Sequence, residues 1–278
     1  MTIAEALRDA ARRLEPVSDT ARLDAELLMA HQLRVSRSDL LLKHMQDDAL
    51  PHLANFEHFV ARRLGHEPIA YILGQQEFFG RTFAVMPGVL IPRADSETTV
   101  QAALDAAPVN ARVLDCGTGS GALLLTFLAE RPDASGIGID ASAEAAMVAA
   151  ANTAPLGLTG RVQFLRRDWT QEGWADDLGA FDLVIANPPY VEQDADLDPG
   201  VRDFEPAEAL FAGPEGLDDY RVLIPQLPAL LSEGGVAVLE IGASQALTVA
   251  EIAAKYGFTA LVGKDLAGRD RAITLRLS

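Results

Sequence analysis

The strongest constraint on the fold is an alternation of strand-like and helical stretches from about residue 94 to residue 278. Helical patterns, such as residues 121–131 and 142–154, lie between most of the strand-like runs. This alternation predicts an α/β fold, an open and mostly parallel sheet covered by helices. The seven predicted strands are residues 112–116, 135–140, 162–168, 181–187, 235–242, 258–264 and 271–277.

The part of the chain before residue 94 differs in its sequence pattern and shows no alternation of strands and helices. Residues 1–67 repeat apolar side chains at helical spacing and predict a small helical bundle. Residues 68–93 are rich in aromatic and β-branched residues, and Pro87-Gly88 marks a turn between two β-like runs. We therefore expect three parts: a helical domain at 1–67, a β-hairpin linker at 68–93 and an α/β domain at 94–278.

The net charge of −17 is unevenly distributed along the chain. Residues 1–93 hold 11 Lys and Arg against 12 Asp and Glu, whereas residues 94–278 hold 12 against 28. An acidic field disfavours the neutralisation of phosphates on which non-specific DNA binding depends. The charge therefore weighs against a nucleic-acid partner without excluding a local basic patch.

Other features of the composition narrow the class of protein. No apolar run approaches the roughly 20 residues of a membrane span, and the first residues lack an apolar signal core, so we expect a cytoplasmic protein. The single cysteine, Cys116, excludes an intrachain disulfide and a thiolate metal cluster. All five histidines lie within residues 1–66, so we expect neither a metal site nor a histidine base in the acidic part.

A glycine-rich turn follows the first predicted strand of the α/β domain. The five residues Gly117, Thr118, Gly119, Ser120 and Gly121 follow an acid at Asp115 and lead into a helix. Glycines let the backbone bend sharply and let a ligand approach it closely. The spacing is GxGxG and not the GxGxxG of the dinucleotide fingerprint. The acid and the glycines together resemble the S-adenosylmethionine loop of class I methyltransferases, and the alternative is a plain strand-to-helix turn.

The next two strands end in further polar residues. Asp140 ends the second strand, where a carboxylate accepts hydrogen bonds from both hydroxyls of a ribose, or else caps the following helix. Asp168 and Trp169 close the third strand, where they suit the exocyclic amine and the flat face of an adenine. The alternative for Trp169 is a partly buried ring that covers the sheet.

The fourth strand ends in Asn187-Pro188-Pro189-Tyr190. Neither proline has an N–H group, so the pair cannot continue a central strand. The Asn187 side-chain oxygen and the Pro188 carbonyl then remain as two neighbouring acceptors, which suit an NH2 group on a planar, conjugated atom. Accepting two N–H bonds orients the nitrogen lone pair toward an electrophilic methyl group, and no metal is required. Tyr190 is expected to form a wall against the substrate.

Several longer stretches carry a resemblance to a known family. The chain resembles the glutamine methyltransferases of peptide chain release factors at 187–190 and at the stretches AYILGQQEFFG (70–80), VLIPRADSE (89–97), LDCGTGSG (114–121), EPAEALFAGPEGLDDYR (205–221), LEIG (239–242) and GRDR (268–271). The resemblance implies a class I methyltransferase fold, S-adenosylmethionine as cofactor, and class 1 release factors as protein substrates, methylated on the glutamine amide of a Gly-Gly-Gln motif. It also implies a helical N-terminal domain that helps to hold the release factor.

The resemblance also implies which residues form the site. Gly117 to Gly121, Asp140, Trp169 and Asn187 are expected to contact S-adenosylmethionine, and Asn187, Pro188, Pro189 and Tyr190 to hold the glutamine during catalysis. Asp168 joins the cofactor-binding set because its carboxylate suits the adenine amine. We expect a monomer with no metal, no DNA partner and no membrane partner.

Three alternatives remain open at this point. A sibling branch methylates a glutamine of a ribosomal protein, adenine-N6 DNA methyltransferases share the NPPY tetrapeptide, and a non-enzymatic cofactor-binding scaffold is the third. Arg93 and Glu97 either pair on a helix surface or lie near the cofactor entrance. The acidic loop 192–208 is either a solvated lid or a surface for a basic partner.

Overall fold

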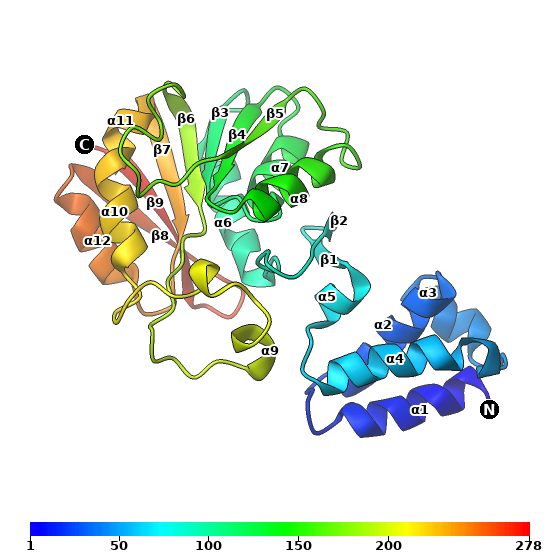
Figure 1. Cartoon of the computed structure of the whole chain (residues 1–278). Coiled ribbons are helices and arrows are strands. Elements are labelled where there is room, and N and C mark those ends of the chain that lie inside the picture. Colours follow the sequence, from blue (N-terminus) through cyan, green and yellow to red (C-terminus); the bar gives the residue numbers. More distant parts are fainter. The chain divides into compact units, whose positions relative to one another are not determined.

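The computed structural model describes residues 1–49 and 51–278 in full, and Leu50 by its backbone alone. The chain forms two compact units, which we describe separately (Figure 1). One unit holds residues 1–75 together with 197–204, and the other holds residues 76–196 together with 205–278.

The first unit is a helical bundle around an apolar core. Leu7, Leu28 and Phe56, from three different helices, are completely buried at its centre. The first helix begins with a capping box, because Thr2 accepts from the Glu5 N–H while the Glu5 side chain accepts from the Thr2 N–H. Its helices and helical turns are α1 (Ile3–Leu14), α2 (Ala21–Leu33), α3 (Arg37–Asp39), the π-helical turn η1 (Leu40–His44), the 3-10 turn η2 (Leu50–His52), α4 (Leu53–Leu64), α5 (Ile69–Leu73) and α9 (Pro199–Arg202).

Two predictions for residues 68–93 are wrong in detail. Ile69–Leu73 is the short helix α5 and not a β-like run, and it ends where Gly74 takes a left-handed conformation. The hairpin consists of β1 (Gln75–Phe78) and β2 (Arg81–Ala84), so its turn lies at Phe79-Gly80, both with positive φ. Pro87-Gly88 instead forms a separate turn, in which the Val89 N–H donates to the Met86 carbonyl.

The second unit contains the predicted mostly parallel sheet, with seven strands in the order β5-β4-β3-β6-β7-β9-β8. Strands β5, β4, β3, β6 and β7 run parallel, whereas β9 is antiparallel to both β7 and β8. The strands are β3 (Arg112–Cys116), β4 (Ser135–Asp140), β5 (Val162–Arg166), β6 (Phe181–Ala186), β7 (Leu231–Glu240), β8 (Phe258–Lys264) and β9 (Asp270–Leu277).

Helices cover both faces of this sheet, because successive side chains of the central strands point to opposite faces. Leu183 and Ile185 pack into the core under α6 and α7, whereas Val184 and Ala186 pack into the core under α10, α11 and α12. The helices of this unit are α6 (Glu97–Ala106), α7 (Ala122–Glu130), α8 (Ala143–Thr153), α10 (Asp218–Leu223), α11 (Leu227–Leu230) and α12 (Ala246–Ala254), with short 3-10 turns η3 (Ala94–Ser96), η4 (Ala207–Ala209) and η5 (Ile224–Gln226).

The strand order reverses between β3 and β6, and this reversal positions the site. From β3 the chain continues outward through β4 and β5, and then returns to the other side of β3 with β6 and β7. In open α/β sheets, ligands bind in the crevice beyond the carboxyl ends of the strands at such a switch point. The glycine-rich turn after β3 and Asn187 after β6 therefore meet at this edge of the sheet.

Candidate active site

A cavity of about 810 Å³ lies at the switch point, within the second unit. It brings together residues from the ends of β3, β4, β5 and β6, as well as from the stretch before α6. Of the predicted site residues, Gly117, Thr118, Gly119, Ser120, Asp140, Asp168, Trp169, Asn187 and Pro189 line the cavity. Gly121, Pro188 and Tyr190 are not among the lining residues.

The turn after β3 depends on glycine. Gly117, Gly119 and Gly121 have φ values of 76°, 56° and 82°, in the left-handed region that side chains disfavour. A Cβ on Gly117 would lie 3.0 Å from the Trp169 ring, and one on Gly121 would lie 2.9 Å from Leu125. A Cβ on Gly119 would meet no atom within 4 Å. The turn therefore presents bare backbone to the open cavity at Gly119.

Asp140 connects this turn to the end of β4. Its Oδ2 accepts from the Gly119 N–H at 2.9 Å, and its Oδ1 accepts from the Ser142 N–H at 2.9 Å. Burial raises the pKa of Asp140, and the two N–H donors oppose this rise. The cap of α8 is Ser142, whose hydroxyl oxygen accepts from the Ala145 N–H. Asp140 therefore does not cap α8, which was the alternative role that the sequence allowed.

Asp115 is the one acid of the glycine-loop motif that is completely buried. The Thr118 hydroxyl donates to its Oδ2 at 2.7 Å, which ties the loop to the end of β3. Burial raises the pKa of Asp115 to about 7, and the nearby charge of Asp140 adds to the rise. Asp115 therefore supports the loop from beneath and does not line the cavity.

Asp168 and Trp169 lie at the end of β5. The Trp169 ring packs against the Gly117 backbone. The Asp168 carboxylate accepts from the N–H and the hydroxyl of Thr170, at 2.8 and 2.7 Å, which lowers the pKa of Asp168. Asp219, which no motif in the sequence indicates, also lines the cavity beside Trp169. Burial raises the pKa of Asp219.

Asn187 and Pro188 follow β6. The Asn187 Nδ2 donates to the Ser96 hydroxyl oxygen at 3.4 Å, and none of the described residues donates to its Oδ1. The Pro188 carbonyl likewise accepts no hydrogen bond from the described residues. Both predicted acceptors are therefore available at the carboxyl edge of the sheet, and Asn187 faces the same cavity as the glycine turn.

The Tyr190 side chain is directed away from the cavity. Its hydroxyl donates to Glu240 Oε1 at 3.2 Å and accepts from Arg271 at 3.4 Å. Burial raises the pKa of Tyr190, as does the charge of Glu240. The structure thus connects Tyr190 to a buried polar network under the site, whereas the sequence predicts that it forms a wall against the substrate.

The two residues that the sequence left undecided have separate partners. Arg93 lines the cavity and forms an ion pair with the buried Glu205, whose Oε2 also accepts from the Ile91 N–H at 3.2 Å. Glu97 accepts from the Phe79 N–H at 2.8 Å and does not line the cavity. Glu205 belongs to the acidic loop 192–208, and through these two contacts it holds residues 91–93 at the cavity.

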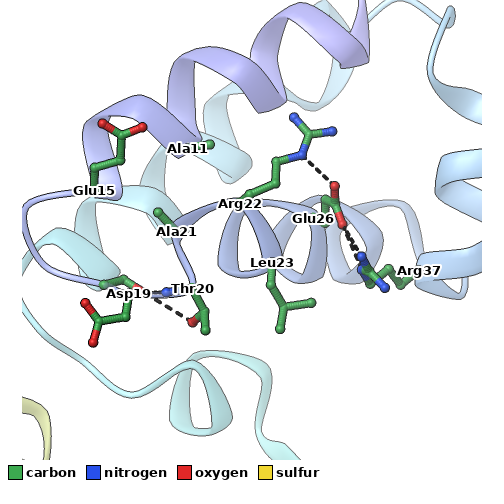
Figure 2. A pocket seen from close by; sticks show the side chains of 10 residues that line it. Ala11, Glu15, Asp19, Thr20, Ala21, Arg22, Leu23, Glu26 and Arg37 are labelled. Atoms are coloured by element: carbon green, nitrogen blue, oxygen red, sulfur yellow. Dashed lines mark hydrogen bonds and ion pairs between the residues drawn. The ribbon is translucent and has the colours of Figure 1, made fainter.

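The helical unit has its own hollow, of about 470 Å³, between α1, α2 and α3. Figure 2 shows that Arg22 and Arg37 both reach the buried Glu26 on one side of it. Two arginines share one carboxylate, so this ion-pair network keeps one net positive charge, and none of its residues is among the predicted site residues. The chemistry-bearing residues are gathered instead in the cavity of the second unit.

The residues of that cavity fit the nucleoside part of S-adenosylmethionine. Bare backbone at Gly119, an acceptor at Asp140 and a flat ring at Trp169 are the groups that a nucleoside requires. Fold and site together define a class I methyltransferase.

Comparisons with known proteins agree with this class. Residues 108–260 match the family described as "Methyltransferase domain", and residues 5–74 match "PrmC N-terminal domain". A methyltransferase from Pyrococcus furiosus has the same fold, with a TM-score of 0.52 and 19% identity over 77% of this chain and 95% of that one. A ribosomal protein L11 methylase from Lactobacillus delbrueckii has a TM-score of 0.50 and 24% sequence identity, over 70% of this chain and 84% of that one.

Full-length relatives identify the family. The release factor glutamine methyltransferase of Cereibacter sphaeroides is 42% identical over 100% of this chain and 99% of its own length. The release factor glutamine methyltransferase of Nitratidesulfovibrio vulgaris is 38% identical over 99% of this chain and 95% of its own length. The chain belongs to the family of release factor glutamine methyltransferases. In the described chain, no helix combines the length and apolar character needed to span a membrane.

Proposed function

We propose that this protein transfers a methyl group to the side-chain amide nitrogen of the glutamine in the Gly-Gly-Gln motif of class 1 peptide chain release factors. The observation that supports this proposal most strongly is the pair of unoccupied acceptors at Asn187 and Pro188, beside a nucleoside-fitting cavity. Family membership and the names of the relatives point to the same substrate class.

S-adenosylmethionine supplies an activated methyl group when it is bound. The residues of this chain then have two tasks, which are to hold the cofactor and to orient the nitrogen. We assign the first task to Gly117 through Gly121, Asp140, Asp168 and Trp169. Asn187 Oδ1 and the Pro188 carbonyl accept the two amide N–H bonds, which directs the nitrogen lone pair toward the methyl group. The nitrogen would form one N–C bond as the bond between the methyl group and the sulfonium sulfur breaks, and the cofactor would leave as the neutral thioether. The proton lost by the nitrogen would go to solvent.

We further propose a division of labour along the chain. Residues 1–67 hold the release factor, residues 68–93 link the two parts, and residues 94–278 carry out the transfer. The acidic charge of the catalytic part supports a protein partner with a basic face over DNA. We also propose that the protein acts as a monomer in the cytoplasm, where release factors function.

One labelling experiment tests the proposed function. The protein is incubated with radiolabelled S-adenosylmethionine and, in separate reactions, with intact release factor, a release factor whose Gly-Gly-Gln glutamine is replaced by alanine, ribosomal protein and DNA. We expect label in the intact release factor alone. Label in DNA or ribosomal protein, or equal label in the alanine version, would contradict the proposal.

The docking surface is tested by salt. If the acidic loop 192–208 and the acidic catalytic part meet a basic face of the release factor, raising the ionic strength should weaken the complex. We expect the Kd of the complex to rise steadily between low and high salt. A Kd that does not change with salt would show that these charges do not face the partner.

A further inference from the structure

Asn187 is held by a buried polar network that the proposed reaction does not itself explain. The network begins at the ends of two neighbouring strands, because Ala186 of β6 pairs with Leu239 of β7. Asn187 and Glu240 follow at equivalent positions, so their side chains leave the same face of the sheet. Ser96, at the end of η3, lies between them and is almost completely buried.

The Ser96 hydroxyl has one proton to donate and two lone pairs to accept with. The Glu240 side chain is completely buried; its Oε1 accepts from Tyr190, and its Oε2 has no hydrogen-bond partner among the described residues. Ser96 is the hydroxyl neighbour that stabilises the charged form of this carboxylate. A hydrogen bond to a carboxylate is stronger than one to an amide oxygen, so we expect the Ser96 proton to go to the unpaired Oε2 of Glu240.

This direction decides how Asn187 is oriented. With its proton on Glu240, Ser96 Oγ is an acceptor, and the Asn187 Nδ2 donates to it at 3.4 Å. The Asn187 Oδ1 must then point away from Ser96. In the reverse orientation, Asn187 would take the Ser96 proton from Glu240 and would present an NH2 group to the NH2 group of the substrate, donor against donor.

We propose that Glu240 is a positioning residue for methyl transfer: acting through Ser96, its carboxylate fixes Asn187 with the side-chain oxygen toward the substrate. Glu240 touches neither cofactor nor substrate in this assignment, and it does not line the cavity. The proposal rests on the proposed function for its catalytic consequence, but the orientation of Asn187 can be measured without any transfer.

The charges around Glu240 are consistent with this role. The buried Arg271 donates to the Tyr190 hydroxyl at 3.4 Å and forms an ion pair with Asp95 at 3.0 Å. Burial raises the pKa of Glu240 to about 7, while Ser96, Arg271 and Tyr190 lower it and Asp95 raises it. Protonated Glu240 can donate to Ser96 and release the constraint on Asn187. The kcat of methyl transfer is therefore expected to rise with pH through about 7.

A matched pair of variants tests the role of the hydroxyl. Ser96→Thr keeps the hydroxyl and Ser96→Val has the same shape as Thr without it. We expect kcat at saturating substrates to stay within about threefold of wild type for Ser96→Thr and to fall about tenfold to a hundredfold for Ser96→Val. The cofactor Kd and Tm should agree between the two. Equal kcat values for this pair would overturn the proposal, and Ser96→Ala replaces Ser96→Val if either variant fails to fold.

Glu240→Gln tests the carboxylate itself. Its amide group donates to Ser96, so kcat should fall about tenfold to a hundredfold and should lose its dependence on pH near 7. An unchanged kcat with the same pH profile would overturn the proposal.

Side-chain amide NMR separates this proposal from the proposed function. The Asn187 side-chain ¹⁵NH2 signal, assigned by its loss in Asn187→Ala, should shift with pH near 7 in the wild-type protein and not in Glu240→Gln. A signal that titrates identically in both proteins would refute the positioning role. If the signal behaves as expected but no release factor is methylated, the proposed function fails and the positioning of Asn187 stands.

Discussion

The carboxyl ends of β3 and β6 pair side by side in the sheet, yet they form their halves of the site by different means. After β3, the site is built from backbone: three glycines with positive φ expose main-chain groups, and Gly119 donates directly to Asp140. After β6, the site is built from a side chain, Asn187, whose position depends on Ser96 and on the buried Glu240.

The two ends should therefore fail in different ways. The backbone-built end is damaged by an added atom, because no space or allowed conformation exists for a Cβ at most of its glycines. The end built from side chains is damaged by a removed hydrogen bond. The first kind of damage should affect cofactor binding, and the second should affect the rate of transfer at saturating cofactor.

The largest effect is expected for Asn187→Ala. This change removes the acceptor that orients the substrate nitrogen, so kcat should fall about 10²–10³-fold, the range seen when one preorganised hydrogen-bonding group is lost. The cofactor Kd, measured by calorimetry, should change by less than about fivefold, because Gly117 through Gly121 and Asp140 remain. The exposed Asn110→Ala is the matched control and should behave as wild type. Near-normal kcat in Asn187→Ala would refute the acceptor pair.

Asp140→Asn should have the opposite pattern. The carboxylate accepts from the N–H groups of Gly119 and Ser142. An asparagine amide has only one oxygen, so its NH2 group must face one of these two N–H donors. The cofactor Kd should rise about tenfold to a hundredfold, with kcat at saturating cofactor within about threefold of wild type. The exposed Asp133→Asn serves as the control for the loss of one charge. A fall in kcat without a change in Kd would mean that Asp140 acts in transfer and not in cofactor binding.

The difference between the two ends also explains what could be predicted from the sequence. The glycine turn, Asp140 and Trp169 follow their own strands directly, so strand prediction and local spacing were enough to bring them to one edge. The parallel sheet was predictable for the same reason, since its strands are short apolar runs between helices.

Residues that act across long sequence distances could not be predicted. Ser96 and Asn187 are 91 positions apart, and Tyr190 and Glu240 are 50 apart. Nothing near Tyr190 in the sequence shows that its hydroxyl would find a buried carboxylate and leave the cavity. The hairpin was misplaced for a local reason: Pro87-Gly88 is the stronger turn signal by composition, but Phe79 adopts a positive φ that its residue type disfavours.

Two glycine variants test the end built from backbone. Gly121→Ala places a Cβ 2.9 Å from Leu125 and 3.2 Å from Ala149, at a φ of 82°, and should lower the free energy of unfolding by about 1–3 kcal/mol. Gly119→Ala meets no atom within 4 Å and should cost only about 1 kcal/mol for its φ of 56°. Its methyl group enters the cavity, however, so the cofactor Kd should rise more than in Gly121→Ala. Urea unfolding and calorimetry measure both quantities, and the reverse ranking would contradict the assigned geometry.

The smallest expected effect concerns two buried acids, one beneath each end of the site. The pKa of Asp115 is raised from 3.8 to about 7, and that of Glu240 from 4.5 to about 7, mainly by burial. Between pH 6 and 7 the unfolded chain has already released both protons, whereas the folded chain still holds much of them. The free energy of unfolding should therefore decrease as pH rises, by about 1 kcal/mol per acid over this interval.

Asp115→Asn and Glu240→Gln should each remove their own share of this slope, measured by urea unfolding at pH 6 and pH 7. Asp133→Asn, an exposed acid, should leave the slope unchanged. If neither buried variant changes the slope, both acids are ionised throughout this range, and the charge on Glu240 cannot be the switch for Asn187. If only Asp115→Asn changes the slope, Asp115 titrates between pH 6 and 7 and Glu240 does not. The Ser96 hydroxyl then keeps one orientation at every pH in this interval.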